Sequence, residues 1–202
     1  MFSDDRFRGY SVSDDHPVGV LDVSYDLPSG LYAALSGRVV AHDGLHPLSL
    51  QVNGGYAKRI SPVLTLDAGI VHSAYARYAA IAPNRSYTEL YVGLSGKLIS
   101  SRVYFSPHYF DGGARTLYGE LDGHVSPARK LTLNGHFGIL VPVRSAEGQA
   151  YRSSYDWRVG GERSLGPVSF HLDWVNAPPR RDAYATEKSR HNKLVFGLSW
   201  AL

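Results

Sequence analysis

The sequence predicts an all-β fold: a single 12-stranded antiparallel up-and-down transmembrane β-barrel with both termini on the periplasmic side. Three observations predict this fold. Large apolar residues alternate with small or polar residues along successive stretches of the chain. These stretches have roughly the 9–11 residues that a tilted transmembrane strand needs. The connections between them are alternately long and short, as in outer-membrane barrels.

Composition limits the class of protein. The chain has 202 residues and no linker or charge run that would divide it, which predicts one domain over residues 1–202. No stretch approaches the roughly 20 apolar residues of a membrane-spanning helix. The absence of cysteine excludes disulfides and thiol metal sites, and a net charge of +3 without a basic stripe argues against nucleic-acid binding. The opening MFSDDRF lacks the basic and apolar regions of a signal peptide, so we expect that an export signal has been removed.

Large apolar residues occupy one parity of each predicted strand, where period two fits better than helical spacing. The first strand, in RFRGYSVS, shows the weakest pattern. The others follow in order over residues 21–25, 31–39, 48–56, 64–70, 88–94, 103–109, 117–125, 131–141, 155–159, 168–174 and 194–202. The last stretch, LVFGLSWAL, separates large from small residues most clearly.

The opposite parity carries the charged and polar residues, which we expect to line the lumen. An acid excess there would favour cations in an open pore. In a soluble sandwich the apolar parity would instead face a shared core, and alternation alone leaves that alternative open. The predicted pore-lining residues are Arg6, Arg8, Asp22, Arg38, Asp67, Glu89, Arg102, His108, Glu120, Asp122, His124, His136, Asp156, Arg158, Glu162, His171 and Asp173.

The connections favour the membrane barrel over the sandwich. Those after even-numbered strands are short: LPSG, KRISP, GKLISS, SPARK and SLGP. Those after odd-numbered strands are SDDHP, AHDGLHP, SAYARYAAIAPNRS, FDGGAR, RSAEGQAYRSS and NAPPRRDAYATEKSRHN. Short periplasmic turns and longer external loops are typical of outer-membrane barrels, and a soluble sandwich predicts no such alternation.

The even strand count allows the last strand to pair with the first, so that no edge is left exposed to lipid. Aromatic residues near the strand ends fit interfacial girdles. These are Tyr25, Tyr56, Tyr109, Tyr155, Trp157, Trp174 and Trp200.

Residues 4–18, DDRFRGYSVSDDHPV, resemble the N-terminal signature of the Gcw_chp family, also called TorF-type porins, in which an Arg-Phe-Arg-Gly core precedes a Ser/Asp-rich first loop. The matching residues are Asp5, Arg6, Phe7, Arg8, Gly9, Ser11, Ser13 and Asp14. The resemblance implies a proteobacterial outer-membrane barrel. The tail, with Gly197, Trp200 and Leu202, is similar to the signal read by the barrel-assembly machinery, although Leu202 stands where Phe is commonest.

Twelve strands would enclose a narrow lumen, wider than that of an eight-stranded barrel. The main prediction is a channel for passive diffusion of small hydrophilic solutes or ions, without cofactor. The alternative is that arginines and carboxylates pair across the lumen and fill it, leaving a structural or surface role. In either case Arg6 and Arg8 are expected near the periplasmic mouth, where they would line an entrance or anchor the first strand to acids of neighbouring strands.

Two further classes of site receive less support. The histidines of the lumen parity lie on separate strands without metal-ligand spacing, so no structural metal is predicted. A lipid-modifying enzyme would need a nucleophile held by a histidine, and Ser169, His171 and Asp173 share one face. No nucleophile motif surrounds Ser169, and simple alternation explains SFHLDW equally well, so the sequence predicts no enzyme.

Two loops suggest partners. The last loop, residues 176–192, carries Arg180, Arg181, Lys188 and Arg190 and could contact the phosphates of lipopolysaccharide, although a solvated loop explains it as well. The loop at residues 73–86, SAYARYAAIAPNRS, is rather apolar and either folds inward as a plug or packs against a neighbour.

Overall fold

The computed structural model describes residues 1–110, 113–144, 152–176 and 192–200. No helix in this part of the chain is long and apolar enough to cross a membrane. The strands are β1 (Arg6–Phe7), β2 (Tyr10–Ser11), β3 (Val18–Asp26), β4 (Leu31–Ala41), β5 (Leu45–Ser61), β6 (Leu64–Tyr75), β7 (Ser86–Ser95), β8 (Ile99–Tyr109), β9 (Ala114–Ala128), β10 (Leu131–Arg144), β11 (Ser154–Leu165), β12 (Val168–Val175) and β13 (Lys193–Trp200).

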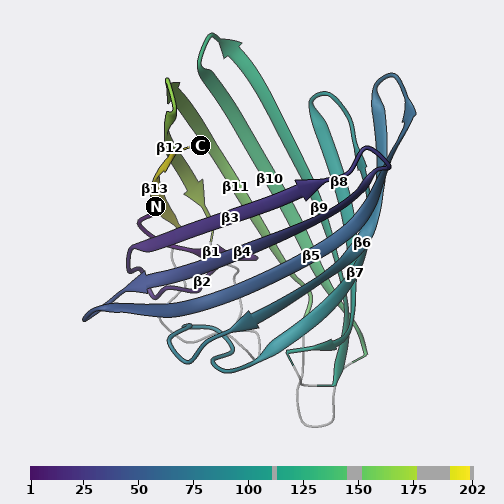
Figure 1. Cartoon of the computed structure of the whole chain (residues 1–202). Coiled ribbons are helices and arrows are strands. Elements are labelled where there is room, and N and C mark those ends of the chain that lie inside the picture. Colours follow the sequence, from purple (N-terminus) through teal and green to yellow (C-terminus); the bar gives the residue numbers. More distant parts are fainter. Residues whose placement is uncertain (111–112, 145–151, 177–191, 201–202) are drawn as a thin grey trace.

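Strands β3 to β13 form one 11-stranded antiparallel sheet in which each strand pairs with its neighbours in sequence. The sheet curls into a barrel, with β3 to β7 on the near side and β8 to β12 on the far side in Figure 1. Strands β1 and β2 pair only with each other and lie between these two walls. The predicted all-β antiparallel fold is confirmed, but the described sheet has eleven strands rather than the predicted twelve.

The first three residues connect the two edges of this sheet. Phe2 forms bridges to Val18 of β3 and Gly197 of β13, with Phe2 N–H donating to Val18 O at 2.8 Å. Ser3 N–H donates to Phe196 O at 2.8 Å. Because Gly197 has no side chain, the Phe2 ring occupies the space that a Cβ would need. The seam between β3 and β13 is therefore bridged by Met1 to Ser3.

The prediction that residues 6–13 supply the first barrel strand is wrong. Arg8 and Gly9 have φ angles of 48° and 82°, which reverse the chain between β1 and β2. In RFRGYSVS one parity holds two arginines and the other holds glycine and serines, so neither side offers a continuous apolar face to lipid. The segment folds into the barrel instead.

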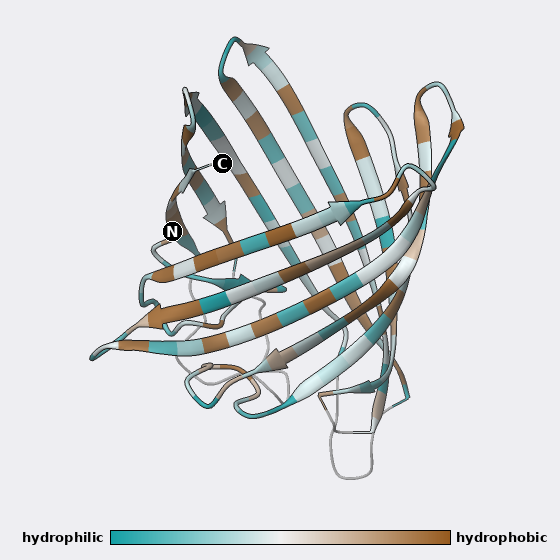
Figure 2. Cartoon of the chain, viewed as in Figure 1, coloured by the Kyte–Doolittle hydropathy of each residue, from teal (hydrophilic) through white to brown (hydrophobic). Residues whose placement is uncertain are grey.

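Alternation along the strands sorts side chains between exterior and lumen. Leu21 and Trp200 are 70% and 66% exposed on the outside, whereas the inward Asp67 and Glu89 are 9% and 2% exposed. Figure 2 shows the resulting alternation of apolar and polar residues along each strand. An apolar exterior around a polar interior is the reverse of a soluble protein, and it is what a hydrocarbon solvent requires.

A β-bulge changes the parity near the end of β8. The register of β8 with β9 shifts between Ser106 and Tyr109. As a result Tyr109 is fully buried inside the barrel, whereas His108 is exposed. The predictions that His108 lines the lumen and that Tyr109 belongs to an outer girdle are both wrong, because one extra residue exchanges the two faces.

The connections differ at the two ends of the barrel. Residues 27–30, 62–63, 96–98, 129–130 and 166–167 form short turns at what we call the short-turn end. In the first of them Gly30 has a φ of 95°, and a Cβ there would collide with the carbonyl oxygen of Ala57. The opposite, long-loop end holds residues 4–17 and 76–85. The expected loop AHDGLHP is shorter than predicted, since Leu45 to Pro47 belong to β5.

Candidate functional site in the barrel lumen

A cavity of about 700 Å³ lies in the lumen. Inward residues of the strands from β3 to β12 form its wall, and residues 6–9 of the N-terminal segment cover it. The charged residues around it are six carboxylates, Asp26, Asp67, Glu89, Glu120, Asp122 and Asp156, and four arginines, Arg6, Arg8, Arg102 and Arg158. All of these except Asp26 belong to the predicted pore-lining set.

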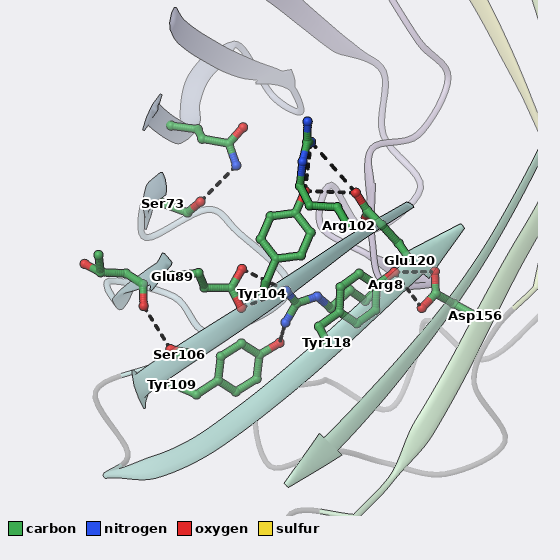
Figure 3. Close-up of polar contacts among 12 residues, drawn as sticks. Arg8, Ser73, Glu89, Arg102, Tyr104, Ser106, Tyr109, Tyr118, Glu120 and Asp156 are labelled. Atoms are coloured by element: carbon green, nitrogen blue, oxygen red, sulfur yellow. Dashed lines mark hydrogen bonds and ion pairs between the residues drawn. The ribbon is translucent and has the colours of Figure 1, made fainter. Parts of the chain in front are cut away.

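Arg8 joins the N-terminal segment to the barrel wall. Its Nη2 donates to both carboxylate oxygens of Glu89 on β7 at 2.8 Å, and its Nη1 donates to the Tyr109 hydroxyl at 2.9 Å. The guanidinium also lies 3.9 Å from the ring centroid of Tyr118. Figure 3 shows Arg8 surrounded by these groups. Side chains of the pair are 5% and 3% exposed, so this is a buried ion pair between segment and wall.

Asp4 organises the N-terminal segment from within. Its carboxylate accepts hydrogen bonds from the Ser11 hydroxyl at 2.6 Å, the Ser13 hydroxyl at 2.9 Å and Arg6 Nε at 2.8 Å. These bonds close the β1–β2 hairpin over a 2% exposed carboxylate. Asp5 lies 3.4 Å from Arg38 of β4, which ties the hairpin to the wall. Burial raises the pKa of Asp5, and Arg38 counteracts part of that effect.

An apolar cluster fills the long-loop end. Tyr10 and Val12 of the N-terminal segment pack there with Ile81 of the loop after β6 and with Phe110. Ala80 N–H donates to Val12 O at 2.7 Å, which joins loop and segment directly. The loop SAYARYAAIAPNRS therefore folds inward as a plug, which is one of the two arrangements that the sequence left open. We call residues 4–17 and 76–85 together the plug.

Arg6 and Arg8 therefore lie elsewhere than predicted. The N-terminal segment occupies the long-loop end, beside Tyr109 and Ala114 at the adjoining ends of β8 and β9. The expectation that both arginines line or anchor the periplasmic mouth, at the short-turn end, is wrong. It assumed that residues 6–13 run along the wall, whereas they turn into the lumen.

A second polar network crosses the wall from β4 to β9. Arg102 Nη2 donates to Asp67 at 2.8 Å, and the Tyr104 hydroxyl donates to Glu120 at 2.9 Å. The Tyr32 hydroxyl contacts both Asp67 and the Tyr91 hydroxyl. Much of the predicted lumen charge is thus paired with neighbours along the wall, as in the filled-lumen alternative, while the cavity remains between them.

His136 on β10 lies between two carboxylates. Its Nδ1 is 2.8 Å from Asp122 on β9 and its Nε2 is 3.1 Å from Asp156 on β11. The Tyr118 hydroxyl reaches both oxygens of Asp156, at 3.3 and 3.2 Å. Gly138 makes this possible, because a Cβ at that position would overlap the Tyr118 hydroxyl.

A third group of inward residues lies on β11 to β13. The His171 Nε2 is 2.8 Å from the Ser199 hydroxyl, and its Nδ1 is 3.8 Å from Glu162. Ser169, the nucleophile of the enzyme alternative, hydrogen-bonds the Ser164 hydroxyl at 3.0 Å, and its neighbour on the strand face, His171, bonds to Ser199 instead. Arg158 lies 4.0 Å from Asp173. The 3.8 Å separation exceeds a hydrogen bond, so His171 lacks the firmly held carboxylate of a catalytic triad.

Two predicted residues lie toward the short-turn end in more open surroundings. Asp22 is exposed and shares a smaller recess with Arg38. His124 is exposed, and its backbone N–H donates to Leu98 O across the short turn after β7. The last loop, with Arg180, Arg181, Lys188 and Arg190, lies outside the described residues.

The inward tyrosines are the main residues that the sequence prediction missed. Tyr32, Tyr91, Tyr104 and Tyr118 line the cavity; the hydroxyls of Tyr32, Tyr104 and Tyr118 bond to its carboxylates, and that of Tyr91 bonds to Tyr32. They occupy the same parity as the charges, so parity could have found them. Glycines on adjacent strands make room for these side chains: Gly55 lies beside Tyr32, and Gly69 beside Tyr91.

Comparison with known proteins agrees with this architecture. The family described as "Bacterial protein of unknown function (Gcw_chp)" matches residues 1–199, so the chain belongs to the Gcw_chp family, as its N-terminal signature predicted. No curated protein matches the chain. Among solved structures, it resembles the NanC porin, with a TM-score of 0.65, 12% identity and coverage of 92% of this chain and 93% of that one. It also resembles the KdgM porin, with a TM-score of 0.60, 11% identity and coverage of 93% and 94%. At these identities the likeness establishes a porin-like barrel fold.

Proposed function

We propose that this member of the Gcw_chp family is a bacterial outer-membrane channel through which small hydrophilic solutes or ions diffuse passively. The observation that carries the proposal is the cavity of about 700 Å³, lined by charged side chains, within a sheet whose exterior is apolar. Such an exterior suits the hydrocarbon of a bilayer, and such an interior suits a hydrated solute. The porin fold is consistent with this role.

The charge distribution favours cations. Six carboxylates and four arginines surround the cavity, and the arginines Arg8 and Arg102 are engaged by Glu89 and Asp67. Asp22 and Asp26 are exposed near the short-turn end. A net negative lumen raises the local concentration of cations and lowers that of anions.

The plug restricts what can pass. It closes much of the long-loop end with an apolar cluster and is bound to the wall through Arg8 and Glu89, so a solute must pass beside the segment or displace it. We therefore propose a channel of small conductance. The proposal also places the short turns and both termini on the periplasmic side. It further includes recognition of the tail by the barrel-assembly machinery and contact of the last loop with lipopolysaccharide.

Single-channel recording across a planar bilayer tests this function. The refolded protein should give small discrete steps, and a salt gradient should give a reversal potential of the sign expected for cation selectivity. Replacing Asp22 and Asp26 with asparagine should reduce that selectivity. The matched control, Asp43→Asn, removes a carboxylate that is 95% exposed in the loop after β4 and should change it little.

A silent membrane containing inserted, folded protein would refute the channel and favour the filled barrel with a structural role. Anion selectivity would refute the charge argument while leaving a channel. Hydrolysis of an ester substrate that disappears in Ser199→Ala would instead establish an enzyme whose nucleophile is Ser199, the hydroxyl that His171 contacts, rather than Ser169.

A further inference from the structure

We infer that Glu120, Asp122 and His136 form a binding site for one divalent transition-metal ion of the Zn²⁺ class on the lumen wall. Each residue offers one ligand atom, and the three atoms all lie within 4.8 Å of one another. This site does not depend on transport, so it is testable whether or not the barrel conducts.

Strand pairing explains why ligand spacing along the chain gave no sign of the site. Asp122 on β9 and His136 on β10 are direct partners in the antiparallel register. Glu120 lies two residues before Asp122 and therefore on the same face of β9. Fourteen residues separate His136 from Asp122 in sequence, yet their side chains are 2.8 Å apart. The spacing of the histidines predicted no metal site, because ligand spacing along the chain does not record which residues the strand register brings together.

Asp156 is an independent indication that His136 is oriented for coordination. A metal-bound histidine commonly places its second ring nitrogen against a carboxylate, which fixes the ring and increases its basicity. Asp156 lies 3.1 Å from His136 Nε2, is 6% exposed, and is itself held by the Tyr118 hydroxyl. This leaves Nδ1 directed toward the ligand carboxylate of Asp122.

Local charge also favours a cation. Three carboxylates, those of Glu120, Asp122 and Asp156, surround one imidazole. The arginine nearest to Glu120, Arg102, is 4.0 Å away and gives its shorter contact of 2.8 Å to Asp67. A divalent ion would compensate this excess at the point where the carboxylates converge.

The donor set selects the class of metal. One imidazole and two carboxylates suit Zn²⁺ and its first-row neighbours, whereas Ca²⁺ and Mg²⁺ prefer oxygen ligands alone. All three residues line the cavity, so the ion can enter from the lumen and keep water in its remaining positions. A bound ion would also change the charge of the lumen wall where a permeating cation passes.

Isothermal titration calorimetry with ZnCl₂ tests the site in the untagged, refolded full-length protein. We expect one equivalent of Zn²⁺ to bind, an affinity loss of at least about tenfold in His136→Gln and Asp122→Asn, and a loss of about 10- to 100-fold in Asp156→Asn. His171→Gln removes another lumen histidine beside a carboxylate and should leave the affinity unchanged. Circular dichroism verifies the fold of each variant, and Glu120→Gln replaces His136→Gln if that variant does not fold.

Three outcomes would overturn the proposal. The first is no heat of binding in the folded wild-type protein. The second is binding that survives His136→Gln but is lost in a His16→Gln, His42→Gln variant, since those two rings lie 4.0 Å apart and offer a competing pair of ligands. The third is Ca²⁺ competing as well as Zn²⁺, which would show a carboxylate cluster without a role for the imidazole.

Discussion

Removing the Glu89 charge should release the N-terminal segment. In Glu89→Gln the Arg8 guanidinium stays buried, with the Tyr109 hydroxyl and the Tyr118 ring but no carboxylate. Breaking a buried ion pair from one side costs about 3–5 kcal/mol. Glutamine can keep one hydrogen bond, so the lower part of this range is expected. A loss of about 3 kcal/mol changes the ratio of seated to released segment by roughly 100-fold.

Limited digestion with trypsin measures that ratio. The Arg6–Phe7 and Arg8–Gly9 bonds lie within the hairpin, where Asp4 and Glu89 hold both guanidinium groups. Cleavage therefore requires release, and its rate follows the released population when reseating is fast. We expect cleavage in residues 6–9 to accelerate by roughly 100-fold in Glu89→Gln.

Asp26→Asn is the matched control, because it neutralises an exposed lumen carboxylate that lies apart from the hairpin contacts. Equal cleavage rates in wild-type protein and Glu89→Gln, with both barrels folded, would refute the reasoning. A double variant with Arg8→Met should recover part of the lost protection, because no unpaired charge is then buried. If the double variant is cleaved after Arg6 as fast as Glu89→Gln, the penalty does not come from the unpaired Arg8.

Three further predictions concern other parts of the barrel. Gly197→Val should displace the Phe2 ring and lower the temperature at which the barrel unfolds on electrophoresis, whereas Gly37→Ala, with no atom near the added Cβ, should not. Gly138→Ala should push the Tyr118 hydroxyl from Asp156 and weaken Zn²⁺ binding about tenfold in calorimetry, with Gly135→Ala as control. Partial burial raises the pKa of Asp15, but the Lys193 ammonium 2.8 Å away outweighs it and leaves that pKa below its ordinary value. The pair therefore stabilises the protein above the ordinary pKa of aspartate, and this contribution is lost as the pH falls through the lowered pKa. Denaturation of Lys193→Met at several pH values should show a free energy of unfolding without this loss.

Parity predicted much of the fold because a barrel wall has only two faces. Along β9, Leu117 and Leu121 are exposed outside, while Tyr118 and Glu120 face the lumen. The rule failed where the backbone departed from period two. The bulge near Ser106 exchanged His108 and Tyr109, and bulges leave only a faint mark in a single sequence.

The contacts inside the lumen depend on register, which parity does not contain. Arg102 could pair with several inward acids, and its partner Asp67 is two strands away, beyond β7. Asp122 and His136 meet because the turn at Arg129 and Lys130, together with a register shift between Leu131 and Leu133, fixes the pairing of β9 with β10. A shift of the register by two residues would keep every side chain on the same face and still abolish this pair.

In the N-terminal segment, the alternation of side chains suggests a strand of the barrel wall, but the charges argue against it. Arg6 and Arg8 alternate with Phe7 and Gly9, which resembles a strand. A barrel strand, however, needs one continuous apolar face, and here the apolar side ends after Phe7. Its arginines need carboxylates, which Asp4 and Glu89 supply only when the chain turns inward. The same turn places a guanidinium over the cavity, so the residues that disqualify this segment as wall are the ones that cover the lumen cavity.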